Sequence, residues 1–418
     1  MLHIPPSLKH KKFFYLWLGQ LISVTGAQMQ LWAIFWHINQ LNPNPIALGG
    51  IGVARILPII IFSLIGGALA DSVDRRKVLF VTQSTAALLA LTLGLLTQFG
   101  SITIWHIYVL TALQAVTLAF DAPSRQALVP NLLPKKDLPN AFSMTFTAAQ
   151  VGSVLGPALS GVVIAAFGQQ AVYYINSMSF VAVIAALVMI GNVPQAFAEK
   201  AAGVSIAAIR EGFKFIFSKP IIFSTMLLDF VATFFASAHT LMPIIAREVL
   251  NVSVVEYGYL SAAPAVGAVL IALVISQVKE IRSQGQIFLG SVIVFGLATV
   301  IFGATRSFII AWLAIAVTGA ADGVSTIIRN TIRQLQTPDH VRGRMTSVNQ
   351  IFFQGGPQLG EIRAGVLAQL FGSPYAIISG GIGCIIGTIA IAWKWPHLTK
   401  YNGDEPMLAG APASAPAD

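Results

Sequence analysis

The sequence predicts an all-α integral membrane protein with twelve transmembrane helices in two pseudo-symmetric six-helix halves. The first observation is compositional: 56% of the 418 residues are hydrophobic, only 10% are charged, and the mean hydropathy is +0.76. Soluble domains carry about 25% charged residues. The second is a series of twelve apolar runs, each close to the roughly 20 residues that span a bilayer. The third is a set of glycines that recurs between the two halves of the chain.

The apolar runs define the expected domains. They lie near residues 13 to 38, 46 to 70, 78 to 100, 103 to 124, 141 to 167, 170 to 191, 221 to 246, 256 to 278, 286 to 304, 308 to 328, 345 to 371 and 375 to 395. We therefore expect six-helix halves at residues 1–192 and 221–396. Residues 193–220 would form a cytoplasmic linker with a short amphipathic helix, and residues 397–418, rich in Ala, Pro, Gly and Ser, a disordered tail.

The basic residues set the topology. If both termini are cytoplasmic, all but four of the 25 Lys and Arg residues lie in cytoplasmic segments. The outer loops hold Arg247 and Arg306, and the spans hold Arg55 and Arg363. This asymmetry follows the positive-inside rule and accounts for the net charge of +9 without a nucleic-acid partner. We expect a multi-pass protein of a bacterial cytoplasmic membrane, in contact with the lipid bilayer.

The two halves repeat one another. Gly152, Gly156, Gly161 and Gly168 recur 204 residues later as Gly356, Gly360, Gly365 and Gly372. Such a repeat predicts halves related by a pseudo-twofold axis along the membrane normal, with a substrate site between them near the midplane.

The loop between the second and third runs carries a motif of small and charged residues. Gly67 permits a close helix approach, Asp71 can accept hydrogen bonds at a helix terminus, and Arg75 and Arg76 mark the cytoplasmic side. The pattern Gly-x-Leu-Ala-Asp-x-x-x-Arg-Arg resembles the signature between helices two and three of major facilitator superfamily transporters. Asp74 stands where that signature usually has Gly. The alternative is an ordinary basic loop after a membrane helix.

The fifth run carries a second motif. Gly152, Gly156, Pro157 and Gly161 place small residues and a helix-bending proline along one face. The segment closely resembles the antiporter motif of major facilitator exporters, which implies efflux. A generic packing face is the alternative, and it leaves the direction of transport open.

Further segments narrow the resemblance over nearly the whole chain. Ala54 to Pro58, Asp121 to Pro130, Arg342 to Arg344 and Gln358 to Glu361 look like the enterobactin-exporter-like branch, which also includes proteins similar to macrolide efflux proteins. The resemblance implies a monomeric transporter of the major facilitator fold. It would export a medium-sized organic molecule, a siderophore or a macrolide-like or drug-like compound, by proton antiport.

Charged residues within the spans are costly and usually functional. Arg55 and Glu361 lie about 13 and 16 Å from the outer ends of their helices at 1.5 Å per residue. Because these helices face each other in the fold that the sequence resembles, we hypothesise that the two residues pair across the halves. The pair would hold the outer side closed. Alternatively, each pairs within its own half or extends to the interface.

Other polar residues within the spans are candidates for the proton and substrate sites. Asp229 and Asp322 are candidate proton carriers or counter-charges for a cationic substrate, and Asp322 is also a structural partner for Arg329. We interpret Asp121 and Arg125 as a local pair that caps a helix. His239 alone among the histidines lies well inside a span and is more suited to packing than to proton relay. A group of polar residues could line a cavity: Gln20, Thr25, Gln28, Gln30 and Asn176.

Several function classes lack their sequence features. Cys384 is the single cysteine, so we expect no disulfide framework and no thiolate metal site. We expect no cofactor, no metal and no enzymatic activity, because the sequence has neither a His-Glu-x-x-His cluster nor a placed nucleophile. It also has no phosphate-binding loop of an ATP-driven pump. An importer of the same fold and a non-transporting receptor or scaffold remain as alternatives.

Overall fold

The computed structural model describes residues 5–194, 213–237, 239–278 and 281–403. It describes the backbone alone at residues 63–72, 339, 340, 342–344, 347, 350, 351 and 354. The chain divides into two compact units. The first comprises Met1–Val204 and Met242–Ala262, and the second comprises Ser205–Leu241 and Ala263–Asp418.

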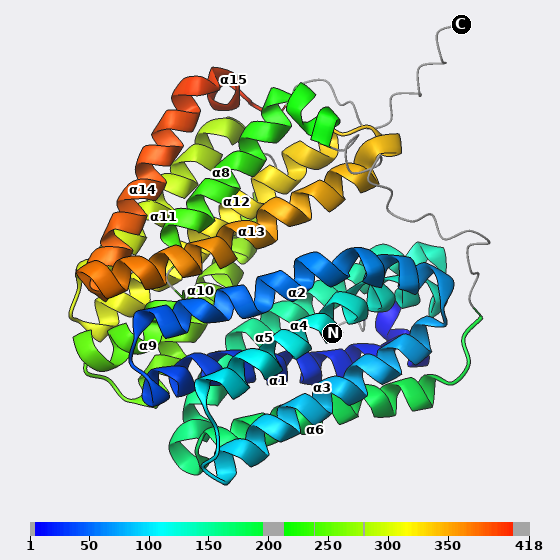
Figure 1. The fold of residues 1–418 in the computed structure, drawn as a ribbon. Coiled ribbons are helices and arrows are strands. Elements are labelled where there is room, and N and C mark those ends of the chain that lie inside the picture. Colours follow the sequence, from blue (N-terminus) through cyan, green and yellow to red (C-terminus); the bar gives the residue numbers. More distant parts are fainter. Residues whose placement is uncertain (1–4, 195–212, 238, 279–280, 404–418) are drawn as a thin grey trace, which may run out of the picture. The chain divides into compact units, whose positions relative to one another are not determined.

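The first unit is helical throughout its described residues (Figure 1). Its elements are η1 (Pro6–Lys9), α1 (Lys11–Leu41), α2 (Pro45–Ser72), α3 (Arg75–Gln98), α4 (Ile104–Leu128), η2 (Val129–Asn131), η3 (Lys135–Asp137), α5 (Leu138–Phe167), α6 (Gln169–Ile190), α9 (Met242–Ile244), η5 (Ile245–Val249) and the first part of α10 (Val254–Ile275). Helix α1 packs against α5 and α6, α2 packs against α4, and α3 packs against both α4 and α6. This arrangement brings faces of α1, α2, α3, α4 and α6 close enough to share a cavity.

Local sequence explains two of the helix boundaries. Asp74 is the N-cap of α3, and its side chain accepts a hydrogen bond from the backbone N–H of Arg76 at 3.0 Å. An aspartate at the position where the resembled signature has glycine therefore satisfies a helix terminus. Gly168 separates α5 from α6 with φ of +80°, a conformation that side chains with a Cβ rarely adopt. Gly372, its repeat partner, separates α13 from α14 in the same way with φ of +89°.

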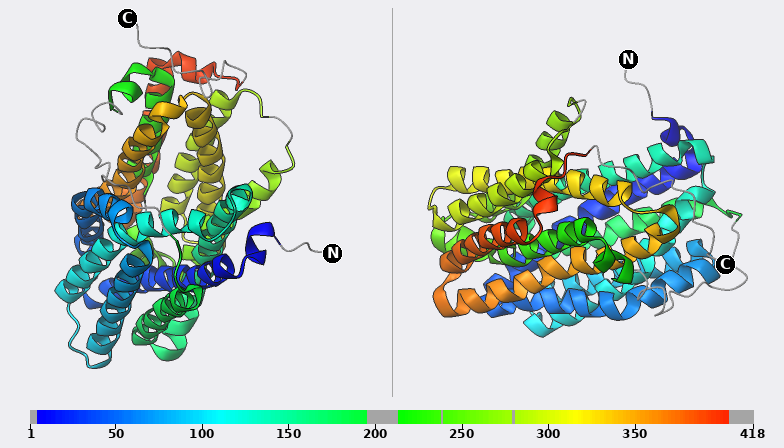
Figure 2. Two further views of the ribbon diagram at one scale, coloured as in Figure 1. Left: turned by 90° about the vertical axis from the view of Figure 1, so that its right-hand side faces the viewer. Right: turned by 90° about the horizontal axis from the view of Figure 1, so that it is seen from above.

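The second unit is also helical throughout its described residues. Its elements are α8 (Pro220–Ala236), η4 (His239–Leu241), the rest of α10, α11 (Gln284–Ala304), α12 (Phe308–Leu335), α13 (Asp339–Phe371), α14 (Ser373–Lys394) and α15 (Pro396–Thr399). Helix α11 packs against α12 and α14, while α8 packs against α13 and α14. Helices α13 and α14 meet at one end, where the chain passes from one to the other, and spread apart from there (Figures 1 and 2).

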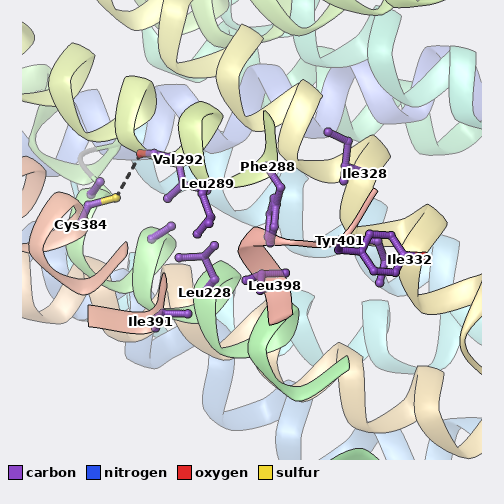
Figure 3. Close-up of a cluster of buried hydrophobic side chains, with 12 residues drawn as sticks. Leu228, Phe288, Leu289, Val292, Ile328, Ile332, Cys384, Ile391, Leu398 and Tyr401 are labelled. Carbon is purple, nitrogen blue, oxygen red and sulfur yellow. Dashed lines mark hydrogen bonds between the residues drawn. The ribbon is translucent and has the colours of Figure 1, made fainter. Parts of the chain in front are cut away.

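An apolar cluster forms the core of the second unit (Figure 3). It joins Leu228 of α8 and Phe288 of α11 to Cys384 of α14, whose Sγ lies 3.7 Å from the Val292 carbonyl oxygen. Residues after α14 complete it, because Leu398 and Tyr401 are both buried. The first residues of the tail predicted from residue 397 onward are thus ordered. Residues 404–418 of that tail lie outside the described residues, and so do residues 195–212 of the predicted linker.

Ten helices within the described residues are long and apolar enough to cross a membrane. The ten do not include α1 and α13, although both coincide with predicted runs. Helix α1 carries Gln20, Gln28 and Gln30 among its apolar residues, and some α13 side chains are not described. The chain is therefore an all-α, multi-pass membrane protein. The count of twelve spans, the cytoplasmic termini and the boundaries of the two halves stay predictions.

Candidate transport site

The first unit contains a cavity of about 460 Å³, lined by side chains from α1 to α6. More than half of its lining residues are polar. Amide side chains from four helices contribute: Gln20, Gln28 and Gln30 of α1, Gln83 of α3, Gln114 and Gln126 of α4, and Asn176 of α6. The sequence had predicted the three α1 glutamines and Asn176 at a cavity, and the structure confirms these positions.

Hydrogen bonds connect three of these amides in a chain. Asn176 Nδ2 donates to Gln30 Oε1 at 2.7 Å, and Gln30 Nε2 donates to Gln114 Oε1 at 2.6 Å. The chain ends at Gln114 Nε2, a buried donor with no hydrogen-bond partner among the described residues. The hydroxyl of Thr111, one turn earlier on α4, is likewise buried without a partner there. Both groups line the cavity, so they are available to a ligand or water.

Among the described side chains that line the cavity, Asp121 is the only carboxylate. One of its oxygens accepts from Gln83 Nε2 at 2.6 Å and from the Thr82 hydroxyl at 3.2 Å, and the other accepts from Arg125 Nε at 3.0 Å. The local pair with Arg125 is confirmed, but the expected capping role is wrong. Asp121 lies inside α4, seven residues before its last residue Leu128, and its carboxylate bonds to side chains of α3.

Arg55 of α2 also lines the cavity and is partly buried. No described residue of the first unit is a hydrogen-bond or ion-pair partner of its guanidinium. The charged side chains of the lining are Arg55, Arg125 and Asp121, so the cavity carries one net positive charge. Glu361 lies in α13 of the second unit and is 5% exposed. Its pairing with Arg55 stays a prediction.

The glycine motif of α5 packs this helix closely against two others. A Cβ on Gly152 would lie 2.8 Å from Val24 of α1, and a Cβ on Gly156 would lie 3.1 Å from the Met29 backbone nitrogen. A Cβ on Gly161 would lie 2.6 Å from a carbonyl oxygen at the start of α10. Pro157 lies inside α5, and its carbonyl oxygen also faces α10, 2.7 Å from the position of a Cβ on Gly258.

The motif between α2 and α3 is described in part. Gly67 and Asp71 lie in the last turns of α2, where the structure describes the backbone alone. Arg75 donates to Asn131 Oδ1, just beyond α4, at 2.9 Å. Arg76 Nε donates to a backbone carbonyl near the end of α6 at 2.7 Å. The two arginines thus connect the start of α3 to the ends of two other helices.

A buried charge cluster lies in the second unit. One guanidinium nitrogen of Arg329 lies 2.9 Å from Asp229 Oδ1, 3.2 Å from Asp322 Oδ1 and 2.9 Å from the Ser325 hydroxyl. The side chains of Asp229 and Arg329 are 2% and 3% exposed, whereas that of Asp322 is 49% exposed. The predicted pair of Asp322 with Arg329 is confirmed. The sequence did not predict that Asp229 of α8 shares the same arginine.

Arg333 extends this cluster by one helical turn. It is buried, its Nε donates to the Arg329 carbonyl oxygen at 2.9 Å, and its guanidinium also bonds to Asn330 and Asn349. Arg333 is the repeat partner of Arg125, at an offset of 208 residues. Four residues before Arg125 the first half has Asp121, whereas the second half has Arg329. In the first unit the repeated arginine thus pairs with an acid of its own helix, while in the second unit the α8 acid Asp229 and the α12 acid Asp322 pair with Arg329, the residue that replaces that acid.

A family model, described as transmembrane secretion effector, matches residues 5–405. The chain belongs to this family of the major facilitator superfamily. It is 26% identical over 363 residues to the staphyloferrin A transporter of Staphylococcus aureus (strain NCTC 8325 / PS 47), covering 86% of this chain and 88% of that protein. It is 24% identical over 350 residues to the enterobactin exporter EntS of Citrobacter koseri (strain ATCC BAA-895 / CDC 4225-83 / SGSC4696), covering 84% and 83%.

Solved transporter structures share the fold of this protein. A bacterial homologue of the human lysosomal transporter Spinster, inward-facing and occupied, superposes with a TM-score of 0.69 at 14% identity over 95% of this chain and 96% of that one. A POT family transporter in complex with a thioalcohol-conjugated peptide gives a TM-score of 0.71 at 14% identity over 95% and 99%. The protein is therefore a membrane transporter of small molecules, with the major facilitator fold that the sequence predicted.

Two polar residues lie elsewhere than the sequence predicted. Thr25 does not line the cavity, because its hydroxyl donates to the Leu21 carbonyl and α5 packs against this part of α1. His239 is exposed in the short η4 turn after α8 and lies outside the regular helices. Among the histidines whose side chains are described, the buried one is His37, which bonds to the Tyr173 hydroxyl at 3.0 Å. The signal that could have located the missed residues of α4 is helical spacing, because Thr111, Gln114, Thr117 and Asp121 recur at intervals of three and four residues.

Proposed function

We propose that this transporter is an exporter of the bacterial cytoplasmic membrane that exchanges protons for a medium-sized organic molecule by alternating access. The observation that carries the proposal is the buried Asp229–Arg329 ion pair, with the half-exposed Asp322 on the same arginine. Ionisable residues within membrane spans are costly and usually mark ion or substrate pathways. Two acids that share one base can also change protonation without moving the backbone.

Asp229 is the proposed proton carrier, and Asp322 connects it to water. A proton that reaches Asp322 from solvent weakens its contact with Arg329, and transfer to Asp229 breaks the buried ion pair. Arg329 then lacks the negative charge of Asp229. Because this ion pair between α8 and α12 is broken, the packing of the two helices can change at low energetic cost. Loss of the proton on the other side of the membrane restores the pair and completes the cycle.

Arg55 and Glu361 form the second charge element of the proposal. Their pairing would close the outer side, and it would part when the site opens outward. The test is a swap of charges: the Arg55→Glu, Glu361→Arg double variant should recover more transport than either single variant. Equal loss in all three variants would argue against the pair.

The export direction rests on the glycine motif of α5 and on the names of two relatives, an enterobactin exporter and a staphyloferrin A transporter. These names also favour siderophore-like substrates over macrolides. The test uses acidified inverted membrane vesicles and a pH-sensitive dye, with siderophores, macrolides and cationic dyes added one at a time. We expect proton release with one class in the wild type and none in Asp229→Asn. Substrate entry only into right-side-out vesicles would identify an importer, and the absence of any flux would favour a receptor or scaffold.

A further inference from the structure

We propose that the cavity of the first unit binds an organic anion rich in hydrogen-bond acceptors, with a carboxylate or phenolate oxygen against Arg55. The inference deepens the proposed function, because it names the chemical class of the transported molecule. It separates the two substrate classes that the sequence left open, since carboxylate- and phenolate-bearing molecules fit the cavity and lipophilic cations do not.

The charges of the lining are the first argument. The Asp121 carboxylate already accepts hydrogen bonds from three side chains, including Arg125. It is therefore saturated and offers no counter-charge to a cationic ligand. Arg55 lacks a described partner within its own unit, although it lines the cavity. While its proposed pair with Glu361 is parted, the partly buried cation of Arg55 is stabilised by an anionic ligand, and a guanidinium can bind a carboxylate through two parallel hydrogen bonds.

The unsatisfied polar groups are the second argument. Gln114 Nε2 can only donate a hydrogen bond, and the Thr111 hydroxyl can donate one. Gln83 Oε1 is the corresponding buried acceptor without a described partner. With the guanidinium of Arg55 added, donors outnumber acceptors among these groups without a described partner. Buried groups left without partners cost free energy, so a ligand that supplies acceptor oxygens would recover that cost.

The size of the cavity and its apolar lining set further limits on the ligand. A volume of about 460 Å³ is within the range of small-molecule sites. The side chains of Phe142 and Phe180 line the same cavity beside the amides. The cavity can therefore hold a carboxylate- or phenolate-bearing molecule that also has a hydrocarbon or ring portion. It would disfavour a permanently cationic dye of equal size, because Arg55 repels it.

Equilibrium binding to the purified full-length protein tests the inference without any proton gradient. Isothermal titration calorimetry would compare citrate, a compact hydroxy-tricarboxylate, with its neutral triethyl ester and with the cation tetraphenylphosphonium. We expect binding of citrate alone and at least a tenfold weaker Kd in Arg55→Gln. The matched control is Arg306→Gln, which removes an exposed arginine outside the cavity and should leave the Kd unchanged.

A second variant separates binding from folding. Thr111→Val keeps the shape of the side chain and removes a buried hydroxyl that lacks a described partner. It should leave thermal stability unchanged or higher and weaken citrate binding at least threefold. Binding of tetraphenylphosphonium in preference to citrate, or citrate binding that is the same in Arg55→Gln, would overturn the inference. Arg55-dependent citrate binding would support it even if no proton-coupled flux were found, and in that case only the proposed function would fail.

Discussion

Removal of the Arg329 guanidinium should destabilise the second unit strongly. In Arg329→Met the buried Asp229 loses an ion-pair partner at 2.9 Å, and no water can take the place of that partner at a side chain that is 2% exposed. The arginine is itself only 3% exposed, so the substitution keeps most of the apolar packing of its stem. The remaining cost is that of a carboxylate left buried without its counter-charge.

The distance between Asp229 and Arg329 and the burial of both side chains set the size of this destabilisation. Two unit charges 2.9 Å apart attract by about 6 kcal/mol at an effective dielectric constant of about 20. Part of this attraction offsets desolvation, and removal of one partner of a buried pair costs about 3–5 kcal/mol in other proteins. The other acid of the cluster should behave differently. Asp322 is 49% exposed, so water screens its contact with Arg329 and Asp322→Asn should cost about 1 kcal/mol or less.

Unfolding in mixed micelles, titrated with SDS and followed by the fluorescence of the seven tryptophans, measures these free energies. The Asp229→Asn, Arg329→Met double variant should recover most of the loss, because it removes both charges. The cost of Arg329→Met should also decrease as the pH falls, since protonation neutralises the uncompensated carboxyl. Equal effects of Arg329→Met and Asp322→Asn, or no recovery in the double variant, would show that the uncompensated charge of Asp229 is not the cause of the destabilisation.

Further predictions concern helix caps and packing. Replacing the N-cap Asp74 by Ala should cost about 0.5–2 kcal/mol of unfolding free energy, whereas Asp74→Gly should cost only a few tenths; equal costs would contradict the capping role. Gly156→Ala should destabilise α5 packing by about 1–3 kcal/mol, while Gly290→Ala in α11, where a Cβ meets nothing within 4 Å, should be neutral or stabilise by up to about 1 kcal/mol. Tyr257→Phe removes a buried hydrogen bond of 3.0 Å to the Trp32 carbonyl and should lower the unfolding free energy by about 0.5–1.5 kcal/mol; an unchanged value would argue against that bond.

The sequence predicted the residues whose effect is local and left open those that depend on packing between helices. Gln20, Gln28 and Gln30 were expected at a cavity because they are polar residues within one apolar run. Gln83 and Thr111 lie among other polar residues of their own helices, and only the packing of α3 and α4 within the first unit brings them to the cavity.

The charge cluster shows the same limit. Asp322 and Arg329 lie seven residues apart on one helix, so their pairing follows from the helical repeat. Asp229 lies on α8, about 100 residues earlier in the chain, and no local pattern indicates which of the buried arginines it meets. The internal repeat does not indicate an acid for this cluster either, because Arg329 stands at the position that corresponds to Asp121.

Asp229 is the residue that we propose couples proton movement to transport. Proteoliposomes that contain the full-length protein can separate coupling from binding, by comparing substrate accumulation driven by a pH gradient with substrate exchange at equal pH on both sides. We predict that Asp229→Asn abolishes the accumulation and retains the exchange, while the control Arg306→Gln retains both. Accumulation at the wild-type level in Asp229→Asn would contradict the claim and require another proton carrier.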